Sequence, residues 1–116
     1  MNITLHKQFV RGTLAAIPSK SIAHRLLICA ALCQSPTEIE CAGSSADIEA
    51  TLNCLRALGA KIEKDGHRLY VQPCPFNHEP VLCDCGESGS TLRFLLPVFC
   101  ALGRPGAITM HGRLPQ

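Results

Sequence analysis

This sequence has few aromatic residues, and its positive and negative charges nearly balance. It has no Trp, 1 Tyr and 4 Phe, and 11 Lys+Arg stand against 9 Asp+Glu, a formal net charge of +2. Without a basic stripe or stacking aromatics, a nucleic-acid-binding module is not expected. No apolar run reaches the roughly 18 residues of a membrane span, and no secretion signal or transit peptide is recognisable. We therefore expect a soluble, cytoplasmic protein with neither a nucleic-acid nor a membrane partner.

The length sets a limit on what the chain can contain. Its 116 residues allow one domain at most, and an apolar fraction of 47% excludes wholesale disorder. The last residues, Arg113 to Gln116, read as an interrupted sequence rather than as the end of a domain. We therefore expect a fragment of a larger protein.

Cysteine is abundant, and its positions favour reduced thiols over a disulfide framework. Cys29, Cys33, Cys54 and Cys100 lie in apolar helical patterns, where a thiol behaves as a small buried hydrophobe. The alternative is a zinc site at Cys83 and Cys85, with His78 nearby. Paired CxxC motifs are absent, however, so no metal site is expected.

The hydrophobic pattern alternates strands and helices. It predicts strands over 2–7 and 12–17, a helix from 19 to about 33, a strand over 37–42, a helix over 46–58, strands over 60–64 and 67–72 joined by Asp65-Gly66, a strand over 80–84, a helix over 92–102 and a strand over 107–110. In the first strand, Ile3 and Leu5 are expected to face inward. In the first helix, the apolar stripe is expected to comprise Ile22, Leu26, Cys29, Ala30 and Cys33.

The order of these elements indicates an α+β fold built from a β-α-β-α-β-β unit. Residues 1–17 are expected to form opening strands, 18–73 a first unit, and 79–116 the start of a second. About one and a half units would then be present.

The first strand-to-helix junction combines small hydroxyl residues with cations. Ser19, Lys20 and Ser21 open the helix, and Arg25 lies about one turn further along the same side. Helix N-termini present unpaired N–H groups and partial positive charge, which attract phosphate or carboxylate groups. A Lys in the first turn opposes the helix dipole, so helix propensity does not account for Lys20.

The second junction has the same character. Gly89 permits close approach of the backbone, Ser90 and Thr91 offer hydroxyls, and Arg93 lies in the first turn of the next helix. Neither a Walker loop nor a GxGxxG motif is present, and a plain N-cap is the alternative interpretation. The residues alone therefore indicate a binding site for a phosphorylated or carboxylated small molecule.

Three segments together resemble the 5-enolpyruvylshikimate-3-phosphate synthase family. They are Pro18–Leu27 (PSKSIAHRLL), Asp47–Ala60 and Gly86–Phe94 (GESGSTLRF), in which many relatives have Asn in place of Glu87. The resemblance implies the enolpyruvyl transferase fold and transfer of the enolpyruvyl group of phosphoenolpyruvate to the 5-hydroxyl of shikimate 3-phosphate, with release of phosphate. It implies neither a metal nor an organic cofactor.

The resemblance also implies roles for individual residues. Lys20 would contact both substrates and act in catalysis, Ser21 and Arg25 would bind shikimate 3-phosphate, and Gly89 and Ser90 would bind phosphoenolpyruvate. Asp47 and Arg93 are candidates for supporting residues around them. For His24 and Glu87, an ordinary surface position is the preferred interpretation.

Family members are several times longer than this chain and are expected to be monomers. We therefore expect the 116 residues alone to be catalytically inactive, and their uncovered strand edges and apolar faces to favour self-association. Two alternatives are a stand-alone anion-binding module and a structural fragment that retains no affinity.

Overall fold

The computed structural model describes residues 3–4, 6–7, 9, 11–75 and 77–115. Its elements run in the order α1 (Lys20–Leu32), β1 (Thr37–Glu40), α2 (Ala46–Ala57), β2 (Lys61–Asp65), β3 (Arg68–Gln72), β4 (Val81–Asp84), α3 (Gly89–Leu102) and β5 (Gly106–Thr109). The fold is α+β, as predicted, and each of these elements matches a predicted one within a few residues.

A serine side chain caps each of the three helices. The hydroxyl oxygens of Ser19, Ser45 and Ser88 accept hydrogen bonds from the backbone N–H groups of Ile22, Ile48 and Thr91 respectively. Each bond satisfies one of the donors that the first turn of a helix leaves unpaired. The cap at Ser88 starts α3 at Gly89, three residues before the predicted start at Leu92.

The core face of α1 differs from the predicted stripe. The buried side chains are Ala23, His24, Leu27, Ile28, Ala30 and Ala31. Of the predicted stripe only Ala30 is buried, whereas Ile22 is 59% exposed and Leu26 is 48% exposed. The helix is apolar on several sides, so sequence periodicity permits more than one core face, and contacts with α2 and α3 decide between them.

β1, β3 and β2 form an antiparallel sheet in that order. In the β2–β3 hairpin, Asp65 pairs with Arg68, so the two-residue loop is Gly66-His67 rather than the predicted Asp65-Gly66. β4 and β5 form a second, parallel sheet, with α3 as the connection between them.

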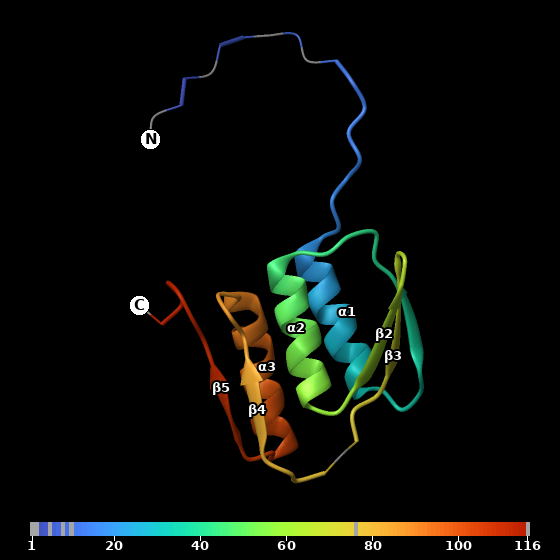
Figure 1. Cartoon of the computed structure of the whole chain (residues 1–116), viewed down its shortest axis with the longest axis vertical. Helices are drawn as coiled ribbons and strands as arrows, with labels where there is room; N and C mark the ends of the chain where they lie inside the picture. The colour runs from blue at the N-terminus through green and yellow to red at the C-terminus, as the bar shows by residue number, and fades with distance from the viewer. Residues whose placement is uncertain (1–2, 5, 8, 10, 76, 116) are drawn as a thin grey trace.

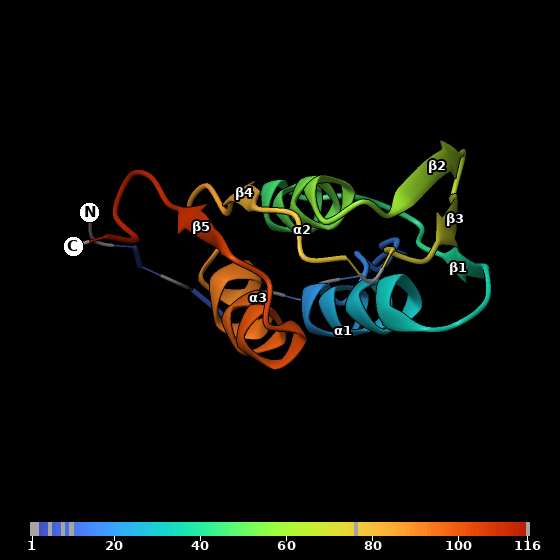
Figure 2. The ribbon, with the colours of Figure 1, turned by 90° about the horizontal axis from the view of Figure 1, so that it is seen from below.

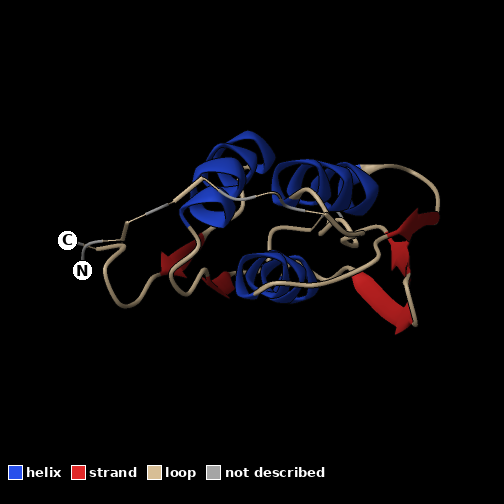
Figure 3. Ribbon diagram, turned by 90° about the horizontal axis from the view of Figure 1, so that it is seen from above, coloured by secondary structure: helices blue, strands red, loops and turns tan. Residues whose placement is uncertain are grey.

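The three helices pack against one another between the two sheets. α1 and α3 lie side by side, and α2 contacts both (Figure 2). The sheets flank this group of helices on opposite sides (Figure 3). The N-termini of all three helices point toward the same end of the molecule (Figure 1).

The predicted strand over 12–17 is wrong. Residues 11–19 form neither helix nor strand, and the segment leads away from the helices as an extended chain (Figure 1). Leu14 is 93% exposed and Ile17 is 86% exposed. A strand needs a partner for its backbone, and alternating apolar residues alone do not supply one. For the predicted strand over 2–7, Asn2 and Leu5 lie outside the described residues, and the others show no strand; Ile3 is exposed.

The eight cysteines are free thiols but are less buried than expected. Cys54, Cys74, Cys83 and Cys85 are buried, whereas Cys29 and Cys100 are exposed. The difference at Cys29 has the same origin as the incorrect stripe on α1. Within the described part of the chain, no helix is long and apolar enough to cross a membrane.

The C-terminal end of α2 generates a prediction about Gly59. The backbone of Gly59 has φ +102°, and an added Cβ would lie 2.7 Å from Cδ of Pro75. Gly66 also has positive φ, +56°, but open space surrounds its Cβ position. We expect Gly66→Ala to lower the free energy of unfolding by about 1–2 kcal/mol through backbone strain. Gly59→Ala should cost at least about 1 kcal/mol more because Pro75 must also move. Urea unfolding of both variants measures the difference, and equal losses would contradict the packing at Pro75.

Candidate anion-binding site at the helix N-termini

The site predicted from the sequence lies where the three helices begin. Lys20 and Ser21 open α1, Asp47 lies in the first turn of α2, and Gly89 and Ser90 open α3. Because the helices point the same way, their unpaired N–H groups and positive dipole ends are gathered at one end of the molecule (Figure 1). The fold thus brings together two junctions that lie about 70 residues apart in sequence.

Lys20 and Asp47 form an ion pair between α1 and α2. The Lys20 Nζ donates to Asp47 Oδ2 at 2.7 Å, and both side chains remain partly exposed. The carboxylate offsets the unfavourable placement of a lysine at the positive end of α1. Because the ammonium is accessible to solvent, it can also contact an anion at this end of the molecule.

Arg25 lies one turn further along α1 and is held by two contacts. Its Nη1 donates to the Ser21 carbonyl oxygen at 2.7 Å, and its guanidinium carbon lies 4.7 Å from the centre of the Phe94 ring. The cation–π contact with Phe94 couples the second turns of α1 and α3. Ser21, Ser90 and Arg93 are exposed at the same helix ends.

Behind these residues, polar side chains from all three helices meet in the core. His24 Nδ1 lies 2.7 Å from Thr51 Oγ1, Thr51 Oγ1 lies 2.8 Å from Thr91 Oγ1, and Thr91 Oγ1 lies 2.7 Å from Ser88 Oγ. Thr91 Oγ1 also lies 3.3 Å from the Asp47 carbonyl oxygen. We call His24, Thr51, Thr91 and Ser88 the buried hydroxyl chain, since each is at most 2% exposed.

The buried hydroxyl chain corrects two expectations from the sequence. His24 is a core residue, 1% exposed, and not a surface residue. The Thr91 hydroxyl, expected to face a ligand, is buried and hydrogen-bonded. Thr51 was not singled out at all. A signal was present, because Thr51 and Thr91 interrupt otherwise apolar core positions of α2 and α3, and a buried hydroxyl requires a partner.

His24 is kept neutral by its surroundings. Burial lowers its pKa, and the positive charges of Lys20 and Arg25 lower it further, while Asp47 opposes them. The ring of Phe94 packs edge-on against the imidazole, with centroids 6.2 Å apart. A neutral imidazole therefore occupies the core beside two cations.

A second set of contacts fastens residues 111–113 beside the start of α3. The Glu87 Oε1 accepts a hydrogen bond from the Arg113 backbone N–H at 3.0 Å, and its carboxylate lies directly against Gly112. Asp84 accepts from the Gly86 N–H and contacts His111 Nε2, each at 2.9 Å, and these contacts lower the pKa of Asp84. Glu87 is exposed, as expected, but it holds a loop in place.

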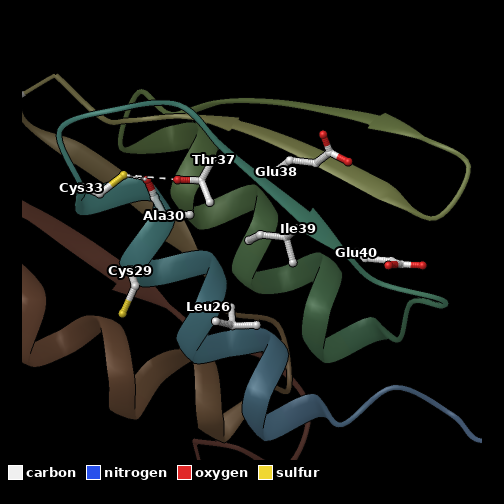
Figure 4. A pocket seen from close by; sticks show the side chains of 8 residues that line it. All are labelled: Leu26, Cys29, Ala30, Cys33, Thr37, Glu38, Ile39 and Glu40. Carbon is white, nitrogen blue, oxygen red and sulfur yellow. Dashed lines mark hydrogen bonds between the residues drawn. The ribbon is translucent and has the colours of Figure 1, made fainter.

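The surface has several hollows, and one of them adjoins this site. It has a volume of about 350 Å³, lies between residues 15–18 and the N-termini of α1 and α2, and is lined in part by Lys20 and Ser45. A groove of about 390 Å³ lies elsewhere, along the C-terminal half of α1, where Leu26 and Ile39 face it (Figure 4). That groove is largely apolar and lies away from the helix N-termini.

The candidate zinc ligands do not come together. Cys83 on β4 and Cys85 directly after that strand are fully buried, whereas His78 is exposed in the preceding loop. Burial raises the pKa of the Cys85 thiol, which disfavours the thiolate that a metal would need. Among the described residues, no group of three or more His, Cys, Asp or Glu is placed to hold a metal ion.

The Glu87 contact generates a prediction about the loop that it holds. Glu87→Ala removes the acceptor for the Arg113 N–H, so hydrogen exchange at that amide should accelerate roughly tenfold, the equivalent of about 1.4 kcal/mol. Glu87→Gln retains a carbonyl oxygen and should stay within about threefold of the parent rate. Amide exchange followed by NMR provides the measurement. An unchanged rate in Glu87→Ala would show that the carboxylate does not hold the loop.

Two sequence relatives of the chain share one description. A 3-phosphoshikimate 1-carboxyvinyltransferase of Clostridium botulinum (strain Alaska E43) is 44% identical over 97 residues, which cover 78% of this chain and 22% of the relative. The enzyme of the same name from Clostridium kluyveri is 37% identical over 116 residues, covering 98% of this chain and 27% of the relative. The chain thus spans about a quarter of the length of these relatives.

The fold also has a counterpart among solved structures. EPSP synthase from Acinetobacter baumannii superimposes with a TM-score of 0.72 and 20% sequence identity, over 87% of this chain and 24% of the other. At that identity the likeness concerns the fold. It shows that the arrangement of three helices and two small sheets occurs within a larger protein.

A family-wide comparison covers nearly the whole sequence. The family model described as EPSP synthase (3-phosphoshikimate 1-carboxyvinyltransferase) matches residues 6–113. This match includes both helix junctions and the loop around Glu87. The chain belongs to the EPSP synthase family.

Proposed function

We propose that this chain forms the N-terminal part of an enzyme that transfers the enolpyruvyl group of phosphoenolpyruvate to the 5-hydroxyl of shikimate 3-phosphate, releasing phosphate. The observation that supports this most directly is the meeting of three helix N-termini beside Lys20 and Arg25. Two anionic substrates held side by side repel each other. Aligned helix dipoles and cationic side chains offset that repulsion.

Each substrate has its own group of residues in this proposal. Ser21 and Arg25, on successive turns of α1, bind shikimate 3-phosphate; the guanidinium offers a two-pronged set of donors to its phosphate. The backbone N–H of Gly89 and the hydroxyl of Ser90 bind phosphoenolpyruvate at the start of α3. Lys20 contacts both substrates.

Lys20 is also the proposed catalytic residue. Addition of the 5-hydroxyl to phosphoenolpyruvate and the following elimination both move protons as charge develops. The Lys20 ammonium can stabilise that charge and hold or donate a proton. Asp47, 2.7 Å from Nζ, aims the ammonium at the site, and Arg93 adds positive potential nearby.

The division of the chain follows the helix junctions. We propose that residues 18–73 form one structural unit and that 79–116 begin the next, since α1 and α3 each start at a serine-capped junction of similar sequence. We place the protein in the cytoplasm, where thiols remain reduced, which suits its eight free cysteines. The whole enzyme is proposed to be a monomer that requires no cofactor.

The first prediction from this proposal concerns the chain by itself. The 116 residues should show no turnover, because they span only 27% of the Clostridium kluyveri relative. A chimera in which this chain replaces the matching part of that relative should convert both substrates. Phosphate release measures turnover, with protein prepared from a host lacking the enzyme. Activity of the isolated chain would refute the first expectation, and an inactive but folded chimera would refute the proposed function.

Substitutions in the same chimera test the residue assignments. Lys20→Ala should lower kcat by at least about 100-fold, because a donor used in the transition state is lost. Arg25→Ala should raise KM for shikimate 3-phosphate about 10- to 100-fold with a smaller effect on KM for phosphoenolpyruvate, since a charge-assisted hydrogen bond is lost.

Lys61→Ala serves as the control for these substitutions. Lys61 is exposed at the start of β2, which follows the C-terminal end of α2, the end opposite Asp47. Its kinetics should match those of the parent chimera. Near-parental activity of Lys20→Ala would remove that residue from the catalytic assignment. Calorimetric titration of the isolated chain with shikimate 3-phosphate distinguishes the two alternatives. A stand-alone binding module predicts measurable heat without any turnover, whereas a structural fragment without affinity predicts no heat.

A further inference from the structure

The buried hydroxyl chain is not explained by the proposed substrate contacts. Its members do not reach the surface, yet they join α1, α2 and α3 directly behind the residues assigned to the substrates. Leucine or valine would fill the same space without requiring hydrogen bonds. Hydrogen bonds of this kind are directional, so the side chains that make them favour one arrangement of the three helices.

The tautomer of His24 depends on how the hydroxyl protons of the buried hydroxyl chain are arranged. Thr91 has one hydroxyl proton, and three acceptors lie within reach of it: the Thr51 Oγ1, the Asp47 carbonyl oxygen and the Ser88 Oγ. When Thr91 donates to Asp47 or Ser88, Thr51 donates to Thr91 and its own oxygen accepts from His24. In this arrangement His24 has its proton on Nδ1 and a lone pair on Nε2.

The surroundings of Nε2 agree with this tautomer. In the described part of the chain, Nε2 is a buried atom with no hydrogen-bond partner. An unpaired acceptor is tolerated in protein cores more readily than an unpaired N–H. The charged groups near the ring are Lys20 and Arg25 on α1 and Asp47 on α2, and α3 presents the Phe94 ring. Their combined effect with burial lowers the pKa of His24, so the neutral ring is maintained.

We propose that His24 is a positioning residue: its Nδ1–H orients the buried hydroxyl chain, which locks the Asp47 turn of α2 to the capped start of α3. This packing affects two groups assigned to the substrates, the Lys20 ammonium and the Gly89 N–H. Asp47 holds Lys20, and Ser88 caps the turn that presents the Gly89 N–H. The buried hydroxyl chain therefore sets the separation between the lysine and the α3 donors. The importance of this separation for enolpyruvyl transfer rests on the proposed function. The claim that His24 controls the separation does not.

The test uses two pairs of variants of nearly matched size. His24→Leu removes the donor, whereas His24→Asn retains an N–H close to the position of Nδ1. Thr51→Val removes the central hydroxyl, whereas Thr51→Ser retains it. If His24→Leu does not fold, the Thr51 pair decides the question. Circular dichroism identifies the temperature range in which each variant remains folded.

The first measurement uses the isolated chain and does not depend on catalysis. Nitrogen chemical shifts should show His24 protonated at Nδ1 in the parent. The amides that report on the start of α3 are those of Thr91 and Leu92, which donate to the Ser88 Oγ and to the Ser88 carbonyl oxygen. Hydrogen exchange at these two amides should accelerate roughly tenfold in His24→Leu and Thr51→Val. His24→Asn and Thr51→Ser should stay within about threefold of the parent. An Nε2–H tautomer, or unchanged exchange in both apolar variants, would overturn the proposal.

The second measurement uses the active chimera. Both apolar variants should lose about 10- to 100-fold in kcat/KM for phosphoenolpyruvate, and the two polar variants should recover most of it. Apolar variants with parental kinetics would overturn the role in positioning the site. If the parent chimera itself is inactive, the proposed function fails, while the exchange measurements still decide whether His24 positions the start of α3.

Discussion

Hydrogen bonding inside an otherwise apolar helix group is the constraint on which this structure depends. The His24, Thr51, Thr91 and Ser88 side chains lie where Leu27, Leu55 and Leu95 supply the surrounding packing. Apolar contacts have no preferred direction, whereas a buried hydroxyl cannot lose its partner without a penalty of about 1–3 kcal/mol. The axial positions of the three helices are therefore fixed relative to one another, and so are their N-termini.

This arrangement explains how two cationic side chains are accommodated at the positively polarised N-terminal ends of the helices. Lys20 is unfavourable at the positive end of α1 taken alone, yet it is stabilised by Asp47 from the neighbouring helix. Arg25 is held over Phe94, a residue of α3. Each cation therefore depends on a partner from another helix, which ties the electrostatics of the site to the packing behind it.

Loop contacts beside the start of α3 also hold this helix end in place. Glu87 and Asp84 hold residues 111–113 against the turn that leads to Gly89. The backbone donors at this helix end are thus supported from behind by the buried hydroxyl chain and from the side by two carboxylates. Support from both directions is what a site needs when its donors are backbone groups, which cannot adjust by changing a rotamer.

The sequence by itself determined the local elements and the chemistry of the helix junctions. Serine caps, the glycine after α2 and the hairpin residues act within a few positions, so the helices and the β2–β3 hairpin were predictable to within a few residues. The motifs around Lys20 and Gly89 indicated anion binding for the same reason. Tertiary structure alone decided which face of α1 is buried, that residues 12–17 form no strand, and that His24 belongs to the core. These outcomes depend on which partners the fold brings together, and periodicity within one segment contains no information about those partners.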